Sequence, residues 1–139
     1  MLASSTWLQA LPLVGWPGLA RSTLASLLPA EGHPRQALVL DRRFVRPLRA
    51  LGHTVLLPAP EVGQSELGKV DLVCATLLGG DLIAALRQYA GWLTSGGMIV
   101  ARGPVRERQR LGAAFLHAGL VDIRQARSGR GYLTAGVVP

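Results

Sequence analysis

Residues 70–101 read VDLVCATLLGGDLIAALRQYAGWLTSGGMIVA, and this stretch decides the fold class. It begins with the apolar run 70–75, which is typical of a buried strand in a parallel sheet. Residues 81–93 follow with apolar side chains at helical spacing, and Asp81 stands where the helix dipole favours an acid. The turn 94–97 then leads into a second apolar strand over 98–101. The stretch therefore predicts a strand–helix–strand unit with two parallel strands.

The flanking sequence extends the same alternation in both directions. Upstream, strands over 37–40 and 54–57 enclose a helix that carries Phe44 and Leu48 and ends at Gly52. Downstream, a basic-faced helix over 105–118 precedes two strands, 121–126 and 132–138, joined by a glycine-rich turn. This order predicts an α/β fold with a three-layer, doubly wound, mostly parallel sheet and an antiparallel hairpin at its C-terminal edge.

The first 34 residues differ in composition from the rest, because Glu31 is the first acidic residue of the chain. We predict a helical arm over residues 1–34 and an α/β domain over residues 35–139. Two interpretations of the arm stay open: it packs on its own domain, or it docks on another chain or a membrane surface. The second interpretation assigns partner contacts to the arm's apolar residues, Trp7, Leu8, Leu11 and Trp16.

Composition excludes several classes of protein. The chain has 139 residues, of which 49% are hydrophobic, so one real core is expected and a disordered tail is excluded. Its one cysteine, Cys74, excludes a disulfide framework and lies in a predicted buried strand. The histidines are scattered, so we expect no metal site. Prolines and an arginine interrupt the apolar span 8–28, so we expect no transmembrane segment and a cytoplasmic protein.

The formal net charge of the chain is +7 at pH 7, and 14 of the 15 basic residues are arginine. Such a field attracts nucleic acid, anionic lipid or acidic protein, although a basic surface also arises from codon bias. In a doubly wound sheet the strand ends that bear Arg42, Arg43 and Arg102 share the carboxyl edge. We expect these three residues to contact an anion or a partner, with Asp41 as an ion-pair partner.

Three segments of the chain resemble class I S-adenosylmethionine-dependent methyltransferases. Residues 70–75 are similar to that family's strand of the type FDLVV, and residues 86–100 to its helix, "L-K-P-G-G" turn and strand. Residues 116–123 resemble its "L-x-x-A-G-F-x-x-V" segment. The resemblance covers roughly residues 35–138, and it implies a Rossmann-like fold.

The resemblance fails at the family's cofactor motifs. The three positions of its glycine loop fall on Asp41, Arg43 and Val45, all of which carry side chains. The position of its ribose-binding acid falls on Ala59. We therefore expect these four positions to be degenerate and the chain to take no cofactor.

The favoured interpretation is a non-catalytic methyltransferase-like domain, a pseudoenzyme that serves as a binding or structural subunit of a larger assembly. A protein partner or a homo-oligomer is expected, and nucleic acid is possible through the arginine clusters. Two alternatives stay open: an active small S-adenosylmethionine-dependent methyltransferase with an atypical pocket, and a basic nucleic-acid-binding module.

Overall fold

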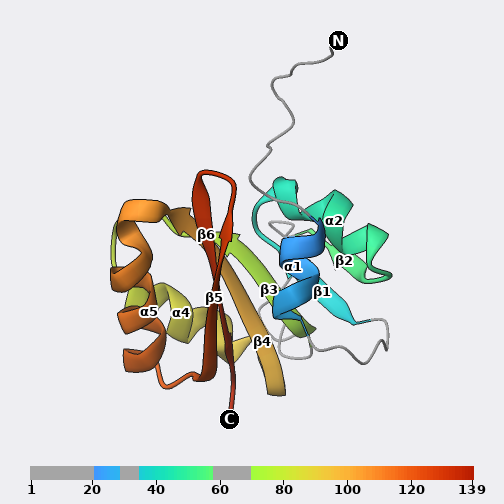
Figure 1. Cartoon of the computed structure of the whole chain (residues 1–139). Helices are drawn as coiled ribbons and strands as arrows, with labels where there is room; N and C mark the ends of the chain where they lie inside the picture. Colours follow the sequence, from blue (N-terminus) through green and yellow to red (C-terminus); the bar gives the residue numbers. More distant parts are fainter. Residues whose placement is uncertain (1–20, 29–34, 58–69) are drawn as a thin grey trace.

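The computed structural model describes residues 21–28, 35–57 and 70–139 (Figure 1). The strands are β1 (Gln36–Val39), β2 (Thr54–Leu56), β3 (Val70–Thr76), β4 (Leu93–Pro104), β5 (Val121–Ser128) and β6 (Gly131–Val137). The helices are α1 (Arg21–Leu27), α2 (Val45–Ala50), α4 (Leu82–Gly91) and α5 (Arg108–His117). Two short 3₁₀ helices precede α2 and α5, namely η2 (Arg42–Phe44) and η3 (Val105–Glu107).

The strands form one sheet in the order β2-β1-β3-β4-β6-β5. The first four strands of this order are parallel to one another, while β6 runs antiparallel to both β4 and β5. The mostly parallel sheet and the antiparallel C-terminal hairpin are therefore confirmed. The hairpin turn is shorter than the sequence predicts, because β5 and β6 extend to Ser128 and Gly131.

Helices cover both faces of the sheet, with α1 and α2 on one side and α4 and α5 on the other (Figure 1). Alternate side chains of β4 divide between the two layers of core. Met98 and Val100 pack with α1 and α2, whereas Ile99 and Ala101 pack with α4 and α5. The three-layer arrangement follows from this alternation, since every central strand is apolar on both faces.

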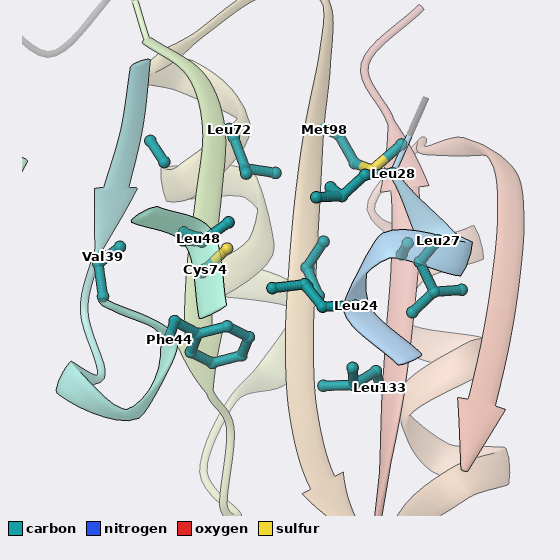
Figure 2. Close-up of a cluster of buried hydrophobic side chains, with 13 residues drawn as sticks. Leu24, Leu27, Leu28, Val39, Phe44, Leu48, Leu72, Cys74, Met98 and Leu133 are labelled. Carbon is teal, nitrogen blue, oxygen red and sulfur yellow. The ribbon is translucent and has the colours of Figure 1, made fainter. Parts of the chain in front are cut away.

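Helix α1 is part of the domain's hydrophobic core. Leu24, Leu27 and Leu28 are buried in the same cluster as Phe44 and Leu133 (Figure 2). Residues 21–28 of the predicted arm thus pack on the α/β domain. The residues assigned to partner contacts, Trp7, Leu8, Leu11 and Trp16, lie outside the described residues.

This strand–helix–strand unit differs from its prediction at three points, the first of which is the end of the helix, at Gly91 instead of residue 93. Helix α4 begins at Leu82, because the side chain of Asp81 caps it and accepts a hydrogen bond from the Ala84 N–H at 3.0 Å. Residues 94–97, predicted as a turn before the strand, lie within β4. The β3–β4 pairing shifts register in this region, and Gly96 takes a φ of +82°, which favours glycine.

Cys74 is fully buried in β3, and burial raises the pKa of its thiol, as expected of a core side chain. Within residues 21–28, 35–57 and 70–139, no helix has the length and apolar character needed to cross a membrane.

Candidate functional site

Three polar side chains lie in one row across the carboxyl edge of the parallel sheet. Thr76, the last residue of β3, is level with Arg102 of β4. Val39 of β1 is level with Cys74 of β3, so Asp41 and Thr76, each two residues further on, are neighbours on the same face. This face is the one covered by α1 and α2. Open α/β sheets bind ligands outside the carboxyl ends of their strands, where this row lies.

Asp41 joins the row to the turn that follows β1. One carboxylate oxygen, Oδ2, accepts a hydrogen bond from the Thr76 hydroxyl. The other, Oδ1, accepts from the Arg43 N–H at 3.0 Å and so caps η2. The guanidinium of Arg43 lies 3.9 Å from Oδ2, which confirms Asp41 as an ion-pair partner.

The two arginines of the row influence each other electrostatically. The pKa of Arg102 is lowered to about 10, first by burial and then by the positive charge of Arg43, while Asp41 opposes the shift. An alanine Cβ at Gly131 would lie 3.1 Å from Nη2 of Arg102 and 2.9 Å from the Gly103 carbonyl oxygen. The absence of a side chain at Gly131 therefore makes room for the Arg102 guanidinium beside β6.

The structure brings together only some of the residues predicted for this edge. Arg43, Arg102 and Asp41 form one electrostatic group. The side chains of Arg42 and Arg43 are both exposed to solvent. Val45 begins α2 and packs, half-buried, against the core. Ala59 lies outside the described residues.

The positions that the family's glycine loop would occupy form a regular helix start. Asp41 is extended, with φ −127°, and Val45 is right-handed helical, with φ −61°. The chain turns through η2 directly into α2. Side chains are accommodated at these positions because neither backbone conformation requires glycine.

Sequence reasoning missed two residues of the site, Thr76 and Gly131. Thr76 had a usable signal, since it is a polar residue that directly follows the apolar run 70–75 of a predicted buried strand. Gly131 had none beyond its place in a glycine-rich turn, because its contact with Arg102 depends on the β4–β6 pairing.

The comparisons with known proteins give different results for sequence and for structure. No family model and no curated protein sequence matches the chain. Solved structures do match, and all those described below are methyltransferases.

A 16S rRNA methyltransferase of T. thermophilus, solved with AdoMet and guanosine, is 21% identical with a TM-score of 0.52. The match covers 89% of this chain but 40% of that protein, so the chain spans less than half of its length. A ribosomal protein L11 methylase of Lactobacillus delbrueckii subsp. bulgaricus has a TM-score of 0.60 at 16% identity, over 78% of this chain and 72% of that protein. Human N-acetylserotonin methyltransferase, solved with SAM, has a TM-score of 0.56 at 12% identity, over 75% of this chain and 47% of that protein.

These structures correct one expectation from the sequence. The expectation that the chain takes no cofactor is wrong, because structural neighbours hold S-adenosylmethionine on the same fold. The expectation was drawn from four positions alone, Asp41, Arg43, Val45 and Ala59, whereas the sheet edge at which such folds take their ligands is formed by the ends of several strands. The fold comparison agrees with the architecture and with the motifs over 70–100. The chain therefore has the Rossmann-like fold of the class I S-adenosylmethionine-dependent methyltransferases.

Proposed function

We propose that this chain is a methyltransferase-like subunit that binds S-adenosylmethionine at the carboxyl edge of its sheet and acts by binding, without transferring the methyl group. One observation carries the proposal: two guanidinium groups, those of Arg43 and Arg102, lie at this edge beside the carboxylate of Asp41. The edge is also where doubly wound folds take their ligands.

The electrostatics of the edge favour an anionic group. The pKa of Arg102 is lowered mainly because its charge is partly buried, and further because Arg43 repels it. The edge therefore places two guanidinium groups and the Asp41 carboxylate close enough to influence one another. S-adenosylmethionine carries a carboxylate, and the planar guanidinium fork binds carboxylates through two parallel hydrogen bonds. Arg43 and Arg102 would hold that end of the molecule.

The carboxylate of the site has a structural role. Both oxygens of Asp41 accept hydrogen bonds, one from the Thr76 hydroxyl and one from the Arg43 N–H. A general base needs an oxygen directed at the proton that it removes. Asp41 holds the ends of β1 and β3 together and so has a structural role at this edge.

Calorimetric titration with S-adenosylmethionine tests the binding. The wild-type chain should bind with a measurable enthalpy, and the double variant Arg43→Gln/Arg102→Gln should bind at least about tenfold more weakly, a loss on the order of 1.4 kcal/mol. Arg46→Gln is the matched control, since Arg46 is an exposed arginine of α2. The binding proposal is wrong if the wild type does not bind or if the double variant binds as the wild type does.

A transfer assay tests the absence of catalysis. Two structural neighbours are named for action on 16S rRNA and on ribosomal protein L11, so these are the acceptors to use. The chain, incubated with methyl-labelled S-adenosylmethionine and either acceptor, should leave the label in the small-molecule fraction. Incorporation that is lost in Arg43→Gln/Arg102→Gln would support the alternative, an active small methyltransferase.

A further inference from the structure

Strand β5 is an edge of the sheet formed by the described strands. It pairs with β6 on one side and ends the strand order (Figure 1). It is eight residues long, and all of them except Ser128 are exposed or half-buried. The pairing with β6 shifts register between Val121 and Arg124, so the regular part of the edge, residues 124–128, presents the backbone N–H and C=O groups that another extended chain is able to pair with.

An apolar groove runs beside this edge, between β5 and α5. Its volume is about 660 Å³, and its lining is formed by Gly112, Leu116, Leu120, Val121, Asp122, Ile123 and Gln125. Leu116 is 68% exposed and Val121 is 46% exposed, and both are among the five large hydrophobic side chains that the described surface exposes. A single exposed hydrophobic side chain is ordinary on a protein surface, but two that line the same groove indicate a contact surface.

The segment of the chain that includes the groove is basic. Residues 105–131 contain six arginines and two acidic residues. Both acidic residues already form ion pairs, Glu107 with Arg110 at 3.5 Å and Asp122 with Arg124 at 3.2 Å. The segment therefore has an excess of four positive charges, which attracts an acidic partner and repels a second copy of the same surface.

We propose that β5 and its groove bind an extended acidic segment of another protein. The segment would add to the sheet as a strand beside β5, with its apolar side chains in the groove and its carboxylates on the surrounding arginines. Backbone pairing supplies affinity in such complexes, while pockets for alternate side chains supply specificity. The surface lies at the edge strand β5, outside the row of Asp41, Thr76 and Arg102, so it is independent of the proposed ligand site.

Two eight-residue peptides of opposite charge test the pairing with the full chain. One alternates glutamate with leucine, and the other alternates lysine with leucine. Fluorescence anisotropy should show that the glutamate peptide binds, that its affinity falls as salt rises, and that the lysine peptide binds at least tenfold more weakly. Backbone hydrogen exchange should slow in β5 on binding. The proposal is overturned if the two peptides bind equally, if the glutamate peptide does not bind at millimolar concentration, or if protection appears elsewhere.

Substitutions test whether the groove, and not another part of the surface, binds the peptide. Leu116→Glu should lower the affinity for the glutamate peptide at least tenfold. Leu78→Glu should leave this affinity unchanged, since Leu78 is 70% exposed but does not line the groove. Arg127→Glu should weaken binding in the same way, with Arg46→Glu as its control. Equal effects in a variant and its control would contradict the proposal. So would a concentration-dependent dimer in analytical ultracentrifugation that Leu116→Glu abolishes, because the occupant would then be a second copy.

Discussion

A single hydroxyl, that of Thr76, ties the end of β3 to the turn after β1. It donates to the carboxylate of Asp41, and a hydrogen bond to a charged acceptor contributes about 1.5–3 kcal/mol. We expect Thr76→Val to lower the free energy of unfolding by about 1.5 kcal/mol, at the lower end because Thr76 is only half-buried. Urea denaturation measures this loss. Thr54→Val on the exposed edge strand β2 is the control, and a loss of the same size there would contradict the explanation.

His53 makes stability depend on pH. Burial lowers its pKa from the ordinary value of 6.5, the charge of Arg35 adds to this, and a hydrogen bond with the Arg35 backbone opposes it. Below pH 6.5 the unfolded chain therefore binds more protons than the folded chain, so the free energy of unfolding falls as the pH falls. We expect His53→Gln to flatten this decline between pH 7.5 and pH 5, as measured by urea denaturation. His117→Gln removes an exposed histidine instead, and equal flattening in that variant would count against the prediction.

At the scale of elements, the contact between β6 and α5 depends on a glycine. A Cβ at Gly136 would lie 2.7 Å from the Phe115 ring and 3.2 Å from the Cβ of Leu120. Phe115 is fully buried, so its ring has little room to move. We expect Gly136→Ala to destabilise the fold by about 1–3 kcal/mol, the usual cost of overpacking a core.

Gly91 offers the matched control, because it ends α4 and a Cβ there would meet no atom within 4 Å beyond its own helix and its chain neighbours. Gly91→Ala should stabilise the fold by about 0.5–1 kcal/mol, because alanine loses less backbone freedom in a helix than glycine does. Thermal or urea unfolding of the two variants should thus give changes of opposite sign. Changes of the same sign would show that packing at Gly136 is not the cause.

At the scale of the whole molecule, the proposed ligand should stabilise the fold. A ligand that binds only the folded chain at a hundred times its Kd raises the free energy of unfolding by about 2.7 kcal/mol. We expect S-adenosylmethionine to raise the melting temperature of the wild type by several degrees and to leave that of Arg43→Gln/Arg102→Gln almost unchanged. Differential scanning calorimetry measures both. An equal rise in the two proteins would place the ligand away from the carboxyl edge.

The order of the layers was predictable because it depends on local patterns. Apolar runs over 70–75 and 98–101 and the helical spacing of 81–93 are properties of neighbouring residues, and they recur in the structure as β3, α4 and the centre of β4. The same holds for the arginines at the carboxyl edge, since parallel strands bring their ends together whatever their exact register. The absence of glycines at 41, 43 and 45 was also visible, but its consequence for the cofactor was misjudged.

The α/β class, the parallel sheet and the closing hairpin could be predicted from the residues alone, because the periodicities of strands and helices are patterns of consecutive residues. Three contacts are seen only in the folded chain: Thr76 donates a hydrogen bond to Asp41, Gly131 leaves room for Arg102, and Leu24 is buried in the core. These contacts join residues that are distant in the chain and that neighbouring strands set level with one another. The pairing register of the strands and the packing of helices on the sheet bring such residues together. Both arise only when the chain folds, so they cannot be inferred from patterns of neighbouring residues.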